Sequence, residues 1–255
     1  MSDLPASAAW GFAVAASLVV GAVAGAVLRV PRRLAAAIAA FGGGTLFAAI
    51  ALELVPEADA GAGPGLTAAG LLAGTLIYVG ADAWLTRDEG MRAMRRSSHA
   101  AASGRAMHMP SDHAEAARGE SIAAGLFVDG VPESLALGLT VARGELGVAL
   151  LVGILVGNVV EAYGAAQPIV AGGHSKGFAI DLLGGIGLAL AASTMLGGSV
   201  LAEASPALVG TAQAVAAGAV LAVVTISIVP YAFGEVSSLV AFVAALGFIL
   251  GYLLS

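Results

Sequence analysis

The chain is dominated by long apolar stretches separated by short polar segments. A helix needs about 20 apolar residues to cross a hydrocarbon core of about 30 Å, so uncharged runs of that length predict transmembrane helices. Eight such runs extend approximately over residues 8–28, 34–55, 66–85, 121–141, 146–170, 178–196, 208–229 and 236–254. We therefore expect an all-α integral membrane protein with eight transmembrane helices in one domain, residues 1–255.

The composition supports a lipid environment. The sequence is 59% hydrophobic and 11% charged, whereas an ordinary globular chain is roughly 25% charged. Glycines four residues apart allow helix backbones to approach closely, and such pairs occur at Gly21 and Gly25, Gly70 and Gly74, Gly153 and Gly157, and Gly247 and Gly251. A net charge of -6 and few aromatic residues disfavour nucleic acid as a partner. The chain has no cysteine, which excludes disulfides and thiolate metal ligands.

Basic residues fall almost entirely on one side of the predicted membrane. Of the Lys and Arg residues, all but Arg143 follow the first, third or fifth span. Cytoplasmic loops carry the Lys and Arg excess, so we expect outside termini and a cytoplasmic loop at 86–120, in the plasma (inner) membrane. That loop contains His99, His108 and His113 and is interpreted either as a linker or as a weak metal-capturing segment.

Ionisable and polar residues cluster within the fourth and fifth spans. Asp129 and Glu133 are four residues apart and share one helix face, and Asn158 and Glu161, three residues apart, do the same. Charged side chains at membrane depth are costly and by default mark a site or pathway. We therefore predict that the two faces line one cavity. Pro132 is expected to kink the fourth span between its two acids.

Two span endings have similar sequences. The second span ends with Glu-Leu-Val-Pro-Glu-Ala at 53–58, and the seventh ends with Ser-Ile-Val-Pro-Tyr-Ala at 227–232. They fall in the second of the first three spans and the second of the last three. This placement predicts an inverted repeat in a 3+2+3 arrangement, with the fourth and fifth spans as the central pair. Kinked helices at corresponding positions of two halves are typical of a transporter's binding region.

The predicted cavity is acidic. Together with Glu53, the set would gather up to four like charges, and no Lys or Arg lies inside the spans to pair with them. Each carboxylate must take up a proton or share a cation, because an unpaired buried charge is strongly disfavoured. A divalent cation with proton exchange satisfies this requirement. The alternative for any single residue, Glu53 above all, is a protonated carboxyl bonded to a neighbouring helix.

The whole pattern resembles the ZIP family of divalent-metal transporters. In that family the fourth span reads His-Asn-x-Pro-Glu-Gly, and here residues 129–134 read Asp-Gly-Val-Pro-Glu-Ser. The fifth-span motif is matched by Asn158 and Glu161, with Gly157 where a donor is usual, and residues 54–58 are similar to the family's Leu-Leu-Pro-Glu-Ala. The resemblance implies a site for one or two metal ions, with ligands Asp129, Glu133, Asn158, Glu161 and Glu53.

Resemblance and ligand chemistry favour different ions. The family implies zinc, but Asp, Glu or Gly replaces each histidine expected at the site, and oxygen ligands suit harder ions such as manganese. We expect transport of divalent cations of the Zn, Mn, Fe or Cd type, with no organic cofactor and no enzymatic activity. The expected partners are these ions and the lipid bilayer, and a homodimer is compatible with the sequence. Two alternatives stay open: a proton-linked carrier or channel for another solute, and a metal-binding relative that does not transport.

Overall fold

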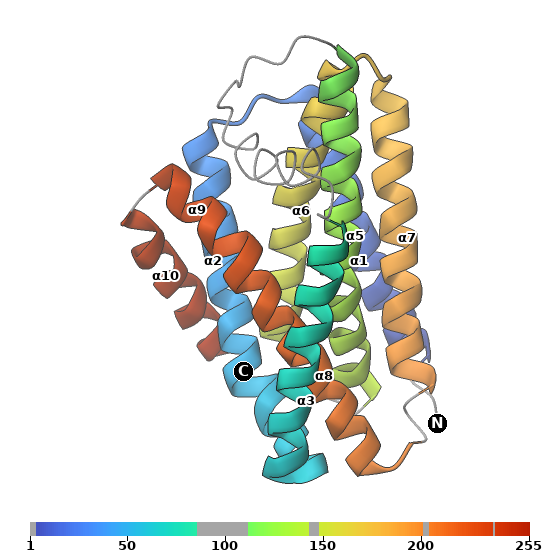
Figure 1. Cartoon of the computed structure of the whole chain (residues 1–255), viewed down its shortest axis with the longest axis vertical. Coiled ribbons are helices and arrows are strands. Elements are labelled where there is room, and N and C mark those ends of the chain that lie inside the picture. Colours follow the sequence, from blue (N-terminus) through green and yellow to red (C-terminus); the bar gives the residue numbers. More distant parts are fainter. Residues whose placement is uncertain (1–3, 86–111, 143–147, 201–203, 237) are drawn as a thin grey trace.

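The computed structural model describes residues 4–85, 112–142, 148–200, 204–236 and 238–255. All regular elements in these ranges are helical, which confirms the predicted all-α class. In chain order they are α1 Leu4–Val27, α2 Arg32–Ala49, η1 Ile50–Leu54, α3 Val55–Leu85, α5 Asp112–Ala142, α6 Val148–Ala171, α7 Lys176–Val200, α8 Pro206–Val223, η2 Val224–Ile228, α9 Val229–Val236 and α10 Leu239–Leu254 (Figure 1).

Six helical runs in the described ranges are long and apolar enough to cross a bilayer. One of them, Arg33–Ala81, has 49 residues and joins the second and third predicted spans. It changes direction at Gly63, where φ is +77° and only glycine avoids strain. Figure 1 shows α2 and the later part of α3 running in opposite directions from this bend. Leu239–Leu254 is apolar but shorter. The helices indicate a membrane-embedded protein in contact with lipid.

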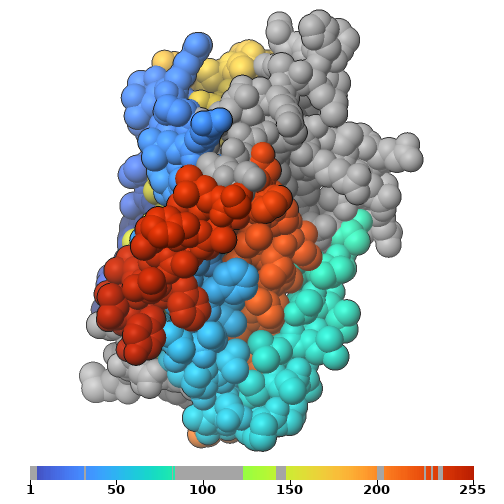
Figure 2. Space-filling view, turned by 90° about the vertical axis from the view of Figure 1, so that its left-hand side faces the viewer, coloured from blue at the N-terminus to red at the C-terminus, as the bar shows by residue number. Residues whose placement is uncertain are grey.

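Each helix packs against a defined set of neighbours. Helix α1 lies against α6 and α7, and α5 lies against the same two helices. Helix α2 packs against α10, whereas α3 packs against α8. Figure 2 shows the face on which α9 and α10 lie across α2, with α3 beside them. The helices that are distant in sequence, rather than sequential pairs, therefore form the closest contacts.

Glycine makes these contacts possible, as the paired glycines predicted. A Cβ on Gly21 or Gly25 of α1 would lie within 2.5 Å of a backbone oxygen of α6. A Cβ on Gly44 would lie 2.0 Å from the Ala244 oxygen of α10, and one on Gly218 would lie 2.1 Å from the Leu71 oxygen of α3. No larger residue fits at these positions without moving a backbone. Because apolar side chains gain little by leaving lipid, such close backbone packing is a main source of helix association there.

The two Val-Pro sequences each follow a π-helical turn. In both η1 and η2, an N–H bonds the carbonyl five residues earlier: Val55 to Ile50, and Val229 to Val224. Helices of 18 residues, α2 and α8, precede the turns. The second span was expected to end at Val55, but the helix continues to the bend at Gly63. A π turn accommodates the proline, which has no N–H to donate, without ending the helix.

Burial follows the same order through the two turns. Positions 50 and 224 are buried, and the two residues after each are exposed. Further along, Leu54 and Ile228 are buried, both prolines are exposed, and Ala58 and Ala232 are buried. All positions at which both side chains are described have the same burial class. The numbering offset is 174 throughout, so 32–49 corresponds to 206–223 and 50–54 to 224–228.

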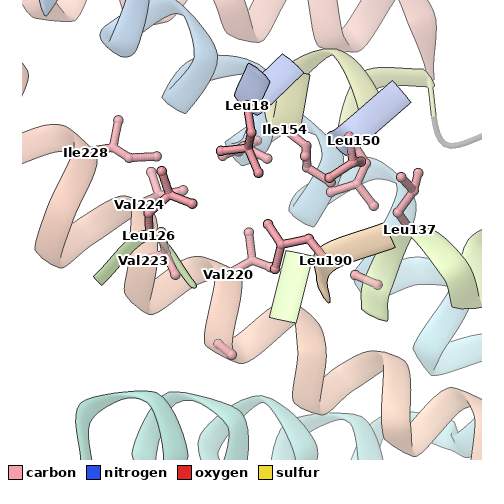
Figure 3. Packing of buried hydrophobic residues seen from close by; sticks show 14 of the residues in the cluster. Leu18, Leu126, Leu137, Leu150, Ile154, Leu190, Val220, Val223, Val224 and Ile228 are labelled. Carbon is pink, nitrogen blue, oxygen red and sulfur yellow. The ribbon is translucent and has the colours of Figure 1, made fainter. Parts of the chain in front are cut away.

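The buried core lies where the long helices meet. Figure 3 shows apolar side chains from α1, α5, α6, α7, α8 and η2 in one cluster. Its labelled members are Leu18, Leu126, Leu137, Leu150, Ile154, Leu190, Val220, Val223, Val224 and Ile228. Large apolar side chains such as Phe12, Leu76, Leu188 and Phe242 instead face outward. This outward distribution fits a surface covered by lipid tails rather than by water.

Helix α5 begins earlier than the sequence predicted. It starts at Asp112 rather than near residue 121, so 112–120 is helical and the predicted loop 86–120 is too long at its C-terminal end. The segment contains three Ala, two Glu and one Arg, all residues of high helix propensity, although its charged side chains make it polar overall. His113 therefore lies in the first turn of α5. His99 and His108 lie outside the described residues.

Candidate functional site

Asp129 and Glu133 lie on α5 in the interior of the molecule. Each side chain is only 6% exposed. The residues are one helical turn apart, and the Asp129 carboxylate acts electrostatically on Glu133. Pro132 lies between them within a continuous helix, and its ring nitrogen cannot donate to the Val128 carbonyl. The sequence prediction of two acids on one buried face of this helix is therefore consistent with the structure.

The connection between α5 and α6 brings the two motifs to one depth. The helices pack against each other, α5 ends at Ala142 and α6 begins at Val148. In such a helical hairpin, residues equally far from the connection lie side by side, so Glu133 corresponds to position 157 and Asp129 to Glu161. At a rise of 1.5 Å per residue, these positions lie roughly 14–20 Å along each helix from Ala142 and Val148.

The α6 residues face two environments. Asn158 is buried, and its Nδ2 donates to Ser17 Oγ of α1 at 3.3 Å. Its amide nitrogen thus binds α1, and only the amide oxygen could ligate an ion. Glu161 is half-buried. Beside Gly157 there is open space, because a Cβ there would have no described atom within 4 Å. The position that carries a donor in the resembled family is therefore an opening here.

Glu53 lies away from this group. Its Oε1 accepts a hydrogen bond of 3.4 Å from the backbone N–H of Ala149, in the first turn of α6. Ala149 precedes Glu161 by 12 residues, which places the Glu53 contact roughly 18 Å from Glu161 along the helix. A carboxylate is favoured at a helix N-terminus by the unpaired N–H groups and the helix dipole. Glu53 therefore bonds a neighbouring helix, which was the alternative to ion binding considered for this residue.

Three polar residues that the sequence did not single out bind two of the acids and Asn158. The Tyr78 hydroxyl of α3 donates to Asp129 Oδ1, Ser17 accepts from Asn158, and Gln213 Nε2 of α8 donates to Glu57 Oε2. The available signal was a hydrogen-bonding side chain within each apolar span. Such residues are common in membrane helices, and no spacing rule connects them to a distant acid.

Tyr163, Gln167 and His174 have structural contacts. The Tyr163 hydroxyl accepts from the N–H of Val30, in the α1–α2 connection, at 2.7 Å and from Gln167 Nε2 at 2.7 Å. His174 lies in the turn before α7 and stacks on Phe178. These contacts show bonds to neighbouring segments for Tyr163 and Gln167 and a place in a turn for His174. They also place the α1–α2 connection beside the C-terminal end of α6.

No metal-binding cluster is assembled among the residues that the structure describes. Within them, no three His, Asp or Glu side chains are grouped so as to hold an ion. Asp129, Glu133, Asn158 and Glu161 share a depth on adjacent helices, but the side chains of Asn158 and Asp129 bind α1 and α3. The ligand set therefore stays a prediction. Comparisons of the chain with protein-family models and with curated proteins find no match.

Proposed function

We propose that the protein is a membrane carrier for divalent metal cations, with Asp129, Glu133, Asn158 and Glu161 as the ion-binding residues. The observation that supports this proposal is the burial of Asp129 and Glu133 on α5, a helix that packs against α6, which carries Asn158 and Glu161. Two acids on one buried face repel each other, and a divalent cation relieves that repulsion. Ligation by three side chains requires that Asp129, Glu133 and Glu161 rotate toward the same ion.

The proposed architecture is eight transmembrane helices in an inverted 3+2+3 repeat. Support comes from the constant offset of 174 between α2–η1 and α8–η2 and from the opposite directions of α2 and α8 in Figure 1. The packing of α2 with α10 and of α8 with α3 also fits two exchanged halves around a central α5–α6 pair. In transporters of this kind, the substrate binds where the repeats meet, near the membrane midplane.

The proposed orientation has outside termini and a cytoplasmic 86–111 segment. Arg29, Arg33 and Lys176 belong to the connections α1–α2 and α6–α7, which lie at one end of the bundle (Figure 1). Glu57 and Asp59 belong to the bend region of α3 at the opposite end. A basic cytoplasmic end follows the positive-inside rule. On this orientation, the ion enters on the side of Glu53, Glu57 and Gln213.

The ligand set consists of oxygen donors, which favours manganese over zinc on chemical grounds. The resemblance to the ZIP family supports zinc instead. The proposal therefore covers both ions, with proton uptake by the emptied carboxylates as the step that resets the site. The test is flux of Zn²⁺ and Mn²⁺ into liposomes that contain the purified protein and a metal-sensitive dye.

The variants Glu133→Gln and Glu161→Gln are expected to reduce metal flux to that of empty liposomes. Asp181→Asn is the matched control, because Asp181 is an exposed acid of α7 and its neutralisation should leave flux unchanged. Wild-type flux in both glutamine variants would contradict the site. Metal binding without flux would favour a non-transporting protein.

The lack of an assembled three-ligand group in the described residues favours one second candidate, a proton-linked carrier of another solute. In that case Asp129 and Glu133 would relay protons. Uptake of protons without any metal flux, abolished by Glu133→Gln, would support this candidate against the first.

A further inference from the structure

Tyr78 contacts the proposed ion site from a helix outside the α5–α6 pair. It is only 1% exposed and is among the largest fully buried side chains in the described part of the chain. Its hydroxyl donates to Asp129 Oδ1. A phenol keeps its proton at neutral pH, so the hydroxyl is the donor and the carboxylate oxygen is the acceptor. Hydrogen bonds to an ionised acceptor are roughly twice as strong as neutral ones.

This hydrogen bond crosses between two packing groups. The main neighbour of α3 is α8, whereas α5 lies chiefly against α6 and α7. Tyr78 lies seven residues before the end of α3 at Leu85, within the apolar run. A buried aromatic hydroxyl at this depth needs a polar partner, and Asp129 provides one. The contact therefore ties one oxygen of Asp129 to α3, a helix that packs mainly against α8.

Ion ligation by Asp129 depends on which oxygens are available. With Oδ1 accepting from Tyr78, one of the two carboxylate oxygens is engaged, which disfavours ligation of an ion through both oxygens. Ligation through one oxygen suits ions that take four to six ligands, such as Zn²⁺, Mn²⁺ and Mg²⁺. Ca²⁺ takes six to eight oxygens and often requires carboxylates that bind through both oxygens. A hydrogen bond to the second oxygen thus opposes the larger ion.

We propose that Tyr78 is a specificity-determining residue of the ion pathway, which restricts Asp129 to one-oxygen ligation and so discriminates against large divalent cations such as Ca²⁺. This inference rests on the proposed function. It adds a residue on α3 to a site otherwise built from α5 and α6. Groups that hydrogen-bond a ligating carboxylate commonly change metal affinity by 10- to 100-fold when removed.

The test compares Tyr78→Phe with wild type in liposomes loaded with a dye that responds to Mn²⁺ and Ca²⁺. Phenylalanine keeps the ring that fills the core and removes only the hydroxyl. We expect the ratio of Ca²⁺ to Mn²⁺ flux to rise about 10-fold. A merely structural role would lower both fluxes together and leave the ratio unchanged. Displacement of bound Mn²⁺ by Ca²⁺, followed by electron paramagnetic resonance in detergent, measures the same preference without transport.

The matched control is Tyr252→Phe. Tyr252 follows Pro230 by 22 residues, as Tyr78 follows Pro56, but its side chain is 63% exposed. The ratio of Ca²⁺ to Mn²⁺ flux in Tyr252→Phe should equal that of wild type. An unchanged ratio in Tyr78→Phe, with a wild type that carries Mn²⁺, overturns the inference and leaves the proposed function standing. A wild type that neither binds nor carries metal overturns the proposed function and this inference with it.

Discussion

The two π turns share a backbone and differ in chemistry. Both follow an 18-residue helix, precede Val-Pro and have the same burial class wherever both side chains are described. The first turn carries Glu53, and Glu57 follows it. The second has Ser227 and Tyr231 at the corresponding positions. The backbone shape is thus shared by two segments with similar apolar residues and a proline, whereas the acids at these two positions occur only in the first segment.

The contacts of the two regions show the same contrast. Glu53 accepts from the N-terminal turn of α6, and Glu57 accepts from Gln213 of α8. In the second region, the Thr225 hydroxyl bonds only carbonyls of its own helix, those of Leu221 and Ala222, among the contacts described. The first turn is therefore linked to two other helices by polar groups. Substitutions at corresponding positions of the two regions test this comparison. Some are expected to have equal effects on stability in both regions, and others are expected to have unequal effects.

The largest effects are expected from Gly44→Ala and Gly218→Ala, which occupy corresponding positions. In each case the new Cβ would lie far inside van der Waals contact distance of a backbone oxygen, at 2.0 Å and 2.1 Å. Overpacking of this kind destabilises by about 1–3 kcal/mol, and backbone atoms cannot rotate away. Thermal unfolding in detergent should show similar losses of stability for Gly44→Ala and Gly218→Ala. Gly80→Ala, with no described atom within 4 Å of its Cβ, is the control. A harmless substitution at only one of the paired positions would contradict their equivalence.

An intermediate and unequal effect is expected from Glu53→Ala and Ser227→Ala. Glu53→Ala leaves the Ala149 N–H without its described acceptor, which costs about 1–3 kcal/mol. For Ser227→Ala we expect a loss below about 1 kcal/mol, because a removed hydroxyl usually costs less than a removed buried carboxylate. Urea-dependent unfolding in mixed micelles would measure both. Glu53→Gln should recover most of the loss, since its amide oxygen still accepts. Equal losses of unfolding free energy in the two alanine variants would contradict the expected difference between the two π-turn regions.

The smallest effect is expected from Gln213→Met. This change removes the donor to Glu57, but Glu57 is half-buried and can be solvated instead. It also removes a buried amide oxygen that has no partner in the described part of the structure. These two effects oppose each other, so we expect the free energy of unfolding to change by less than about 1 kcal/mol in the same urea experiment. A loss well above that would show that the Gln213–Glu57 contact stabilises the first region strongly.

Much of the helical layout could be predicted from hydropathy, because membrane-depth backbone must satisfy its hydrogen bonds internally. The Val-Pro repeat was visible in the sequence because both copies place one proline after an aliphatic pair, and in the structure the first member of each pair is buried. The π turns themselves were not predictable. A proline indicates an interruption, but whether the helix ends or widens depends on packing by residues such as Gly43 and Ile228.

The site was predictable only within single helices. Spacing alone placed Asp129 with Glu133 on one face, because helical geometry fixes neighbours four residues apart. It could not indicate that Glu53 contacts the start of α6 or that Tyr78 reaches Asp129, since both contacts join distant segments. The start of α5 at Asp112 was missed because the hydropathy criterion detects membrane spans and ignores polar helical extensions.

Glycine-to-backbone contact between α2 and α10, and between α8 and α3, has a consequence for the entropy of assembly. A side chain loses rotamer freedom when it is buried, but glycine and alanine have none to lose. Forming an interface from residues such as Gly44 and Ala244 therefore costs almost no side-chain conformational entropy. The chain can join long helices at little conformational expense, which helps to explain how so few polar contacts suffice to hold them together.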